Sequence, residues 1–350
     1  MNTIWSDNVQ GIQTLYLSRK LRFDDVFFCQ YRDSFNIDKD AELKILEIGC
    51  GPGALAEAMH RWYPNAQIIA IDRDSNFISF GRHNVAGVEF IEGDAEHLPF
   101  ADNTFDVTIS NTVQEHIEPN AFLSEQYRVL KPGGICLCLS TRKELSCIAP
   151  CLKITKEEEE FWESVSSEKI LEEYGVCQYP MSEAELPASM EQHSFKDVTT
   201  NYAIINLTPD KPEYSVTMGE RIIKSMRQTN LESIAIASAH STEYKRAIDA
   251  VKSKFDERLR LYSEGIKKWD TSVLVIMIIA AKKDKFQFIG IEKRQTSPDL
   301  SGKTRCTIRL FLYRKHRRMS VFFINSQSKQ SVTKNVSHKI TVNLRKNRPL

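Results

Sequence analysis

Between residues 43 and 141 the chain alternates short β-type runs with helical stretches, and this alternation restricts the fold more than any other feature. Strands that alternate with helices form βαβ units, so the pattern predicts an α/β fold with a mostly parallel sheet. The expected strands are 43–48, 67–71, 88–91, 105–110 and 134–141. The clearest helices are expected at 54–62 and 120–130, the second ended by the turn at 131–134.

The segments that flank this region add helices and two more strands. Residues 9–35 are helical in pattern and rich in aromatic side chains, and 142–193 read as a mostly helical insertion. Strands are expected at 197–207 and 272–281, with a second helical insertion at 208–270 between them. Within that insertion, apolar residues recur every three or four positions, as on one face of a long helix that packs on the domain. They are Tyr244, Ile248, Val251, Phe255, Leu259, Tyr262 and Ile266.

Charge divides the chain near residue 284. Residues 284–350 hold 16 Lys and Arg against 3 Asp and Glu, a net charge of +13, whereas the remainder has a net charge of −12. We therefore expect an N-terminal helical lid segment at 1–42, a domain at 43–283 and a basic extension at 284–350. The extension could bind RNA or an anionic membrane surface, or it could be a poorly ordered terminus. We favour the poorly ordered terminus.

Nothing in the sequence suggests a membrane span or secretion. The longest apolar run, 273–281, is far shorter than the roughly 18 residues that a spanning helix needs, and the N-terminus lacks a signal-peptide pattern. We therefore expect a cytoplasmic protein whose eight cysteines are reduced thiols. No pair of cysteines has CxxC spacing, and no metal site is expected. Cys136 and Cys138 share one face of a predicted strand, where they suit a buried position.

A glycine-rich run follows the first predicted strand and opens the first predicted helix. Gly49, Gly51 and Gly53 fall within five residues, where glycine lets the backbone approach a ligand and the helix offers free N–H groups. Asp72 ends the second strand, 21 residues beyond Gly51. An acid at that place suits a ribose hydroxyl, either of a dinucleotide or of another nucleoside cofactor.

Four quoted segments extend this signal along residues 43–141. "LEIGCGPG", "AIDRD", "FIEGDAEHLPFADNTFDVTISNTVQEHI" and "YRVLKPGG" occur in this order, and they resemble the motifs of the class I S-adenosylmethionine-dependent methyltransferases. The group most similar is that of the ubiquinone and menaquinone C-methyltransferases. The resemblance implies a Rossmann-like sheet of seven strands with helices on both faces, and S-adenosyl-L-methionine as the cofactor. The long segment between the last two strands departs from the family, which usually has a short hairpin there.

The resemblance also implies roles for residues of the first motif. Glu47 is expected near the ammonium of the methionine moiety, where a carboxylate is electrostatically suited. Gly49, Cys50 and Gly51 are expected to pass beneath the methionine and the ribose, and Gly53 belongs to the same cofactor-binding loop.

The later motifs supply the remaining cofactor contacts that the resemblance implies. Asp72 is expected to accept both ribose hydroxyls, and Arg73 to flank the adenine. Asp94 is expected to accept the exocyclic amine of the adenine, and Ala95 to donate its backbone N–H to the ring. Asn111 is expected to offer its backbone carbonyl to the ammonium. Arg73 and Ala95 could also be ordinary loop residues.

Methyl transfer from a sulfonium needs alignment and exclusion of water, and it needs a general base only when the acceptor must lose a proton. His116 is the nearest candidate for such a base, although capping or packing is the favoured role for this residue. The helix at 9–35 and the insertion at 142–193 are expected to form a lid. The lid aromatics of interest, for each of which core packing is the simpler explanation, are Tyr16, Tyr31, Phe161, Trp162 and Tyr174.

The favoured function is therefore methyl transfer to a small-molecule acceptor at O, N or C. An RNA methyltransferase that uses the basic extension is the first alternative, but the cofactor region is acidic and lacks the Asn/Asp-Pro-Pro-aromatic sequence of base-amine methyltransferases. A non-catalytic protein that binds the cofactor is the second alternative, and a nicotinamide-dependent oxidoreductase is a distant third.

Overall fold

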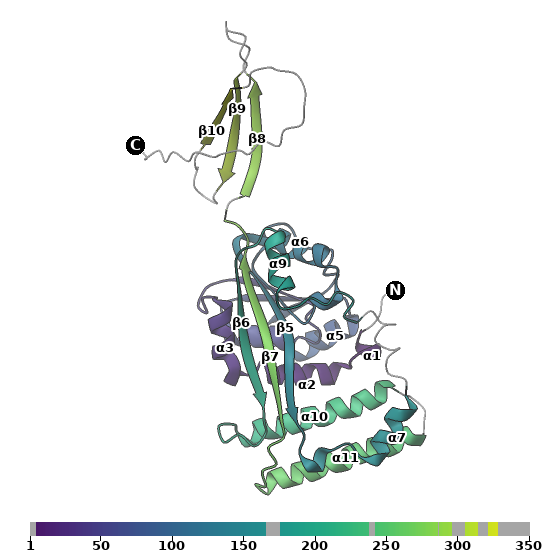
Figure 1. Cartoon of the computed structure of the whole chain (residues 1–350). Coiled ribbons are helices and arrows are strands. Elements are labelled where there is room, and N and C mark those ends of the chain that lie inside the picture. The colour runs from purple at the N-terminus through teal and green to yellow at the C-terminus, as the bar shows by residue number, and fades with distance from the viewer. Residues whose placement is uncertain are drawn as a thin grey trace. The chain divides into compact units, whose positions relative to one another are not determined.

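The computed structural model describes residues 5–165, 176–237, 242–285, 287–295, 305–313 and 321–327. The chain divides into two compact units, Met1–Lys285 and Phe286–Leu350, and each is described by itself. The first of them contains all the helices labelled in Figure 1 and the strands β1 to β7.

A seven-stranded sheet organises the first unit, with the strand order β3-β2-β1-β4-β5-β7-β6. Every pairing from β3 to β5 is parallel, whereas β7 is antiparallel to both of its neighbours. This arrangement confirms the predicted α/β fold with a mostly parallel sheet. The strands are β1 (Lys44–Ile48), β2 (Gln67–Asp72), β3 (Val88–Glu92), β4 (Phe105–Asn111), β5 (Leu130–Cys147), β6 (Lys196–Leu207) and β7 (Thr271–Lys282).

Local signals in the sequence set where the helices begin. Asp74 caps its helix by accepting from the backbone N–H groups of Asn76 and Phe77, and Glu118 caps the next one directly before Pro119. The predicted helix at 54–62 is confirmed with the same bounds. The helices of the α/β layers are α1 (Trp5–Asn8), α2 (Ile12–Arg22), α3 (Phe28–Phe35), α4 (Ala54–Trp62), α5 (Ser75–Asn84), α6 (Pro119–Val129) and α9 (Glu185–Gln192).

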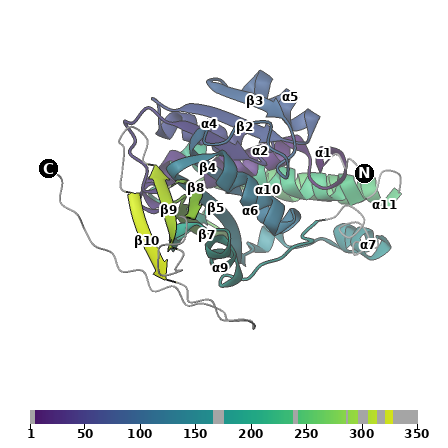
Figure 2. The ribbon, with the colours of Figure 1, turned by 90° about the horizontal axis from the view of Figure 1, so that it is seen from above.

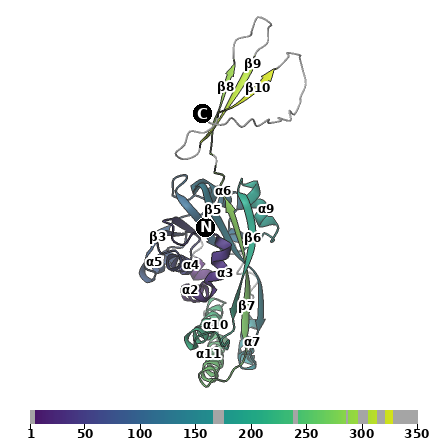
Figure 3. The same ribbon diagram turned by 90° about the vertical axis from the view of Figure 1, so that its left-hand side faces the viewer.

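Helices cover both faces of the sheet, as Figure 3 shows. On one face α2, α3, α4 and α5 bury their apolar residues against one side of the strands, and Tyr31, Phe35 and Ile45 are inaccessible to solvent there. On the other face, Phe122 of α6 and Leu186 of α9 belong to a second apolar cluster. Burial of both faces explains why the parallel strands are almost continuously apolar.

A third apolar cluster lies where β5, β7 and β6 extend beyond the strands β1 to β4 (Figure 1). It is built by α7 (Lys156–Ser164), α10 (Val216–Ala237) and α11 (Thr242–Ser263). Val251 and Phe255 are buried in it, which confirms the predicted apolar face of a long helix, although Ile266 lies beyond the end of α11. From above, Figure 2 shows α2 between α4 and α10, so the cluster adjoins the N-terminal helices.

Two expectations about β5 were wrong. The expected turn at 131–134 does not precede the strand, because β5 already begins at Leu130. Leu130 pairs with Phe105 and Ile135 with Val107, so residues 131–134 fall within a register shift between these two pairs. Residues 142–147 were expected in a helical insertion, but they continue β5 and pair with β7 down to Cys147 opposite Thr271. Long-range pairing with β7 determines the conformation there, and a local pattern cannot reveal it.

The second unit contains a three-stranded antiparallel sheet in the order β10-β9-β8. Its strands are β8 (Gln287–Gln295), β9 (Arg305–Tyr313) and β10 (Val321–Gln327). These strands correct the expectation of a poorly ordered terminus, which rested on the basic charge of residues 284–350, over the residues that the structure describes there. In the described part of the chain, no helix has the length and apolar character needed to cross a bilayer.

Candidate functional site

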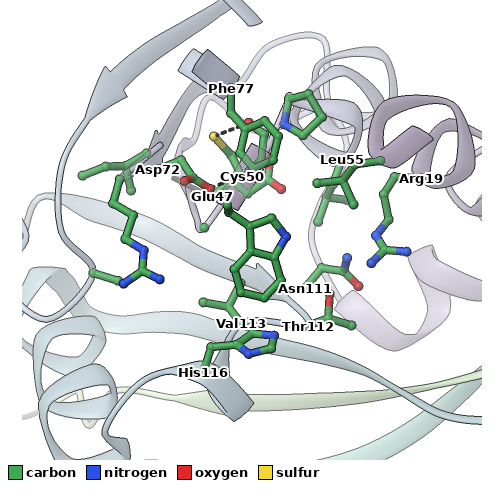
Figure 4. Close-up of a pocket in the computed structure, with 18 of the residues that line it drawn as sticks. Arg19, Glu47, Cys50, Leu55, Asp72, Phe77, Asn111, Thr112, Val113 and His116 are labelled. Carbon is green, nitrogen blue, oxygen red and sulfur yellow. Dashed lines mark hydrogen bonds between the residues drawn. The ribbon is translucent and has the colours of Figure 1, made fainter. Parts of the chain in front are cut away.

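A cavity of about 530 Å³ opens at the carboxyl ends of β1, β2 and β4 (Figure 4). Ligands of open α/β sheets bind at this edge, where the strand order reverses between β1 and β4. The cavity brings together most residues that the motifs predicted. These are Glu47, Gly49, Cys50, Gly51, Asp72, Arg73, Asp94, Ala95, Asn111 and His116.

The loop between β1 and α4 forms the floor of the cavity. The backbone N–H groups of Gly49 and Cys50 donate to the carbonyl of Ile71 on β2, which holds the loop against the neighbouring strand. Gly49 and Gly51 have φ angles of +66° and +53°, in the left-handed region that glycine adopts without strain. A Cβ atom on Gly49 would lie 2.5 Å from Cγ2 of Val113, so the loop has no room for a larger residue there.

Asp72 lies beside this loop at the end of β2. Its Oδ2 accepts the backbone N–H of Gly51 at 2.8 Å, and its Oδ1 accepts that of Asp74 at 2.9 Å. Burial raises the pKa of the Asp72 carboxyl, although these two bonds oppose the shift. Each carboxylate oxygen keeps a further lone pair, so the group can also accept hydroxyl groups from a ligand.

Glu47 and Asn111 carry buried polar atoms that no described residue satisfies. Oε2 of Glu47 and Oδ1 of Asn111 have no hydrogen-bond partner within the described residues. Burial raises the pKa of Glu47 well above its ordinary value. Unsatisfied buried acceptors are costly, and a cationic ligand group beside them would remove that cost. Asp94 is exposed at the end of β3, where its Oδ1 accepts the N–H of Glu96.

His116 ends the 3₁₀ helix η2 (Gln114–His116) and faces the cavity. Its Nδ1 accepts the backbone N–H of Cys177 at 2.9 Å, and its ring meets Trp5 edge-on with centroids 4.8 Å apart. Burial, and then the charge of Arg73, lower the pKa of His116 to about 4. The neutral ring therefore carries its proton on Nε2, so it presents a donor and not a basic nitrogen to the cavity.

The N-terminal segment supplies a wall that the motifs did not reveal. Ser6 donates to both carboxylate oxygens of Asp74, which fixes α1 on the cap of α5 and brings Trp5 to the cavity. From α2, Arg19 and Arg22 also line it. Their spacing of three residues on a predicted helix was a signal that could have identified them.

The expected lid aromatics do not line the cavity. Tyr16, Tyr31 and Phe161 are buried in the apolar clusters, and Trp162 packs against the third cluster, in agreement with the simpler explanation of core packing. Tyr174 lies outside the described residues. Gly53, which was expected in the cofactor-binding loop, is not among the residues that line the cavity. It is the N-cap of α4 with a φ of +91°, and a Cβ atom there would lie 2.5 Å from the ring of Phe90.

The order of the sheet and the glycine loop with its acid at the end of β2 define a Rossmann-like nucleoside-binding domain. Residues 46–138 match the family described as "Methyltransferase domain". The part of the chain that contains the glycine loop and Asp72 is therefore similar to this methyltransferase family, and the sheet around it has the Rossmann-like arrangement.

Curated relatives match mainly the same region. The chain is 34% identical over 172 residues to a fatty-acid O-methyltransferase of Mycolicibacterium smegmatis, which covers 41% of this chain and 62% of the relative. It is 41% identical over 101 residues to a ubiquinone/menaquinone biosynthesis C-methyltransferase of Desulfotalea psychrophila, covering 28% of this chain and 41% of the relative. The chain thus spans less than two thirds of the length of either relative.

Solved structures resemble the chain over a longer span at low identity. Phosphoethanolamine N-methyltransferase 2 of Haemonchus contortus, in complex with S-adenosyl-L-methionine, has a TM-score of 0.46 at 16% identity, and the match covers 81% of this chain and 60% of that one. Geranyl diphosphate C-methyltransferase of Streptomyces coelicolor has a TM-score of 0.38 at 16% identity, covering 76% and 80%.

Proposed function

We propose that the chain transfers a methyl group from S-adenosyl-L-methionine to a small-molecule acceptor by in-line displacement. The observation that carries this proposal is the bond between Asp72 and the N–H of Gly51, which joins the acid of β2 to a glycine loop at the edge of the sheet. The names of the relatives, a fatty-acid O-methyltransferase and a quinone C-methyltransferase, support a small-molecule acceptor. A cytoplasmic location belongs to the same proposal.

The residues of the cavity fit this cofactor. Asp72 would hold the ribose hydroxyls, Asp94 and Ala95 the adenine, and Glu47 with the carbonyl of Asn111 the ammonium of the methionine moiety. Arg73 would flank the adenine, and Gly49, Cys50 and Gly51 would support the ligand from below. Each acid in this set faces a donor or a cation of the cofactor, which is the complementarity that binding needs.

When bound, the cofactor supplies a methyl group on a positively charged sulfur. The protein then has to align the acceptor and exclude water, and Trp5 and residues of α2 line the cavity in which this would occur. Because Nε2 of His116 carries the proton, this residue would donate a hydrogen bond to the acceptor and would not remove a proton from it.

The first test is calorimetry with S-adenosylhomocysteine and with NAD. We expect the former to bind and the latter not to bind. Asp72→Ala should weaken binding by about 1.5–3 kcal/mol, since a charged acceptor of two hydroxyls is lost. Asp33→Ala is the matched control, because Asp33 is exposed and pairs with Arg32, away from the cavity lining. Equal affinity of the wild type and Asp72→Ala would overturn the assignment of Asp72.

The two alternative functions predict different results in a labelling experiment. A non-catalytic binding protein would bind S-adenosylhomocysteine but transfer no label from radioactive S-adenosyl-L-methionine to metabolites of a cell extract. An RNA methyltransferase would label RNA, and removal of the basic extension would abolish that labelling.

A further inference from the structure

Two arginines of α2 face the cavity that the proposed cofactor would share with its acceptor. Arg19 and Arg22 are three residues apart, so they lie on the same side of the helix. Leu15 and Phe23 of the same N-terminal segment line the cavity beside them. The motifs that suggest the cofactor site assign no role to either arginine.

Neither guanidinium group has an ion-pair partner in the part of the chain that the structure describes. Arg22 donates from Nη1 to Oγ1 of Thr141 at 3.3 Å, which is a neutral acceptor. Burial lowers the pKa of both arginines, and the charge of Arg22 lowers that of Arg19 further, whereas Glu115 attracts Arg19 and Glu144 attracts Arg22 only from a longer range. A cation withdrawn from water without an anion is unfavourable, so this end of the cavity attracts a negatively charged ligand group.

The cofactor accounts for one anion at most on this side. Asp72, which would bind the ribose of the cofactor, lies on one side of the cavity. Figure 4 shows Arg19 on the opposite side, and Asn111 is drawn nearer to Arg19 than Asp72 is. A Cβ atom on Gly51 would lie 3.2 Å from Leu15, so Leu15 marks where α2 meets the glycine loop. At about 1.5 Å per residue, Arg19 lies roughly 6 Å and Arg22 roughly 10 Å farther along the helix axis.

Arg22 therefore lies farthest from the glycine loop, next to Thr141 of β5. The methionine moiety of the cofactor has a single carboxylate, which the nearer Arg19 can reach. A second anion in the cavity would pair with Arg22, and the remaining ligand of the cavity is the methyl acceptor. The same cavity also offers apolar lining from Trp5, Phe23, Val113, Ile117 and Val176, beside polar residues that include Glu115.

We propose that Arg22 and Thr141 form a subsite for a carboxylate of the methyl acceptor, and that the acceptor is a carboxylic acid with an apolar body. This inference rests on the proposed methyltransferase function. The charged head pairs with the guanidinium, and the apolar body lies against Phe23 and the other apolar walls.

The test uses the full chain saturated with S-adenosylhomocysteine, and decanoate as the probe. Decanoate should bind, and decan-1-ol should bind at least about 10-fold more weakly. Arg22→Gln should weaken decanoate binding on the order of 10- to 100-fold and leave the affinities for decan-1-ol and S-adenosylhomocysteine within about twofold of wild type. Arg22→Lys should recover part of the affinity.

Lys20→Gln is the matched control, since Lys20 is on the same helix but pairs with Glu57 outside the cavity. Its decanoate affinity should equal that of the wild type. Thr141→Val provides a second variant that keeps every charge, and it should weaken decanoate binding less than Arg22→Gln does.

Three results would overturn the subsite. Decanoate that does not bind, or that binds equally to wild type and Arg22→Gln, excludes a carboxylate at Arg22. An Arg22→Gln variant that loses affinity for S-adenosylhomocysteine and not for decanoate assigns the arginine to the cofactor. Failure of S-adenosylhomocysteine to bind the wild type would instead contradict the proposed function itself.

Discussion

His116 was the one candidate for a general base, and its surroundings determine what it can do. Because Nδ1 accepts the N–H of Cys177, protonation of the ring removes that bond and places a charge near Arg73. Burial, and then the charge of Arg73, lower the pKa of the ring from 6.5 to about 4 in the folded protein. The folded ring stays neutral while the unfolded chain takes up a proton below pH 6.5, so this residue lowers the free energy of unfolding as the pH falls towards 4.

We expect His116→Asn to reduce this loss of stability in acid. The amide oxygen of asparagine can still accept the N–H of Cys177, but the side chain does not titrate. Urea unfolding at pH 7.5 and pH 4.5 measures the loss for each protein. The loss should be smaller in the variant than in the wild type. An equal loss in both proteins would show that His116 has an ordinary pKa.

Gly53 and Gly265 have similar backbone angles, so a comparison of alanine at the two positions distinguishes backbone strain from steric overlap. Gly53 and Gly265 have φ angles of +91° and +73°, so alanine at either position costs about 1–2 kcal/mol of backbone strain. A Cβ atom at Gly53 would also lie 2.5 Å from Phe90, whereas at Gly265 it meets nothing within 4 Å. Overpacking adds about 1–3 kcal/mol.

Gly53→Ala should therefore be less stable than Gly265→Ala by about 1–3 kcal/mol in chemical denaturation. Since Gly53 does not line the cavity, the folded variant should keep its affinity for S-adenosylhomocysteine. Equal stability of the two variants would mean that Phe90 moves aside without cost.

At the scale of the elements, a buried arginine joins α11 to the start of β7. Arg258 is fully buried, and it donates to Asp270 at 2.8 Å and to Asp210 at 2.9 Å. Asp210 in turn accepts the N–H groups of Lys268 and Trp269, which lead into β7. The hydrogen bonds among Arg258, Asp210 and Asp270 therefore connect the third apolar cluster to β7 of the sheet.

Arg258→Ala should lower the free energy of unfolding by about 3–5 kcal/mol, because two buried carboxylates lose their counter-charge. Arg260→Ala is the control on the same helix, where an exposed arginine pairs with Glu257 and Glu264, and it should cost less than about 1 kcal/mol. Urea denaturation of both variants gives the comparison. Similar losses would show that Arg258 is no more important than a surface ion pair.

The sequence predicted elements well where local periodicity decides the structure, and poorly where distant pairing does. Helix α4 was predicted with its observed bounds because glycines precede it and Pro64 follows it soon after its end. The continuation of β5 to Cys147 depends on β7, more than a hundred residues later in the chain, and no local pattern indicates it. The glycine loop and Asp72 were predictable from their spacing. The spacing of Arg19 and Arg22 places them on one helix face, but their position in the cavity depends on where α2 packs, beside β5.

At the scale of the whole molecule, the boundary between the two units gives a test of the domain organisation. Lys283 still belongs to the first unit, where its Nζ donates to the carbonyl of Leu130 and its carbonyl accepts from Gly133. Residues after Lys285 belong to the second unit. The core of the first unit should therefore be complete without them.

Truncation after Lys285 should leave the melting temperature and the affinity for S-adenosylhomocysteine unchanged. Differential scanning calorimetry and titration calorimetry measure the two quantities on the full and the truncated chain. Truncation after Ala280, which removes the end of β7 and Lys283, is the destabilised comparison. A large loss on truncation after Lys285 would give the basic extension a role in holding the first unit together.

The place of β7 between β5 and β6 has a consequence for how the chain acquires its structure. During synthesis β6 emerges before β7, and it has no partner in the sheet until β7 follows. In a partly folded chain that lacks β7, the edge of β5 that β7 later covers and both edges of β6 stay open. Such open edges are where another molecule can pair, so the period before β7 inserts is when the nascent chain is most exposed to aggregation and most dependent on chaperones.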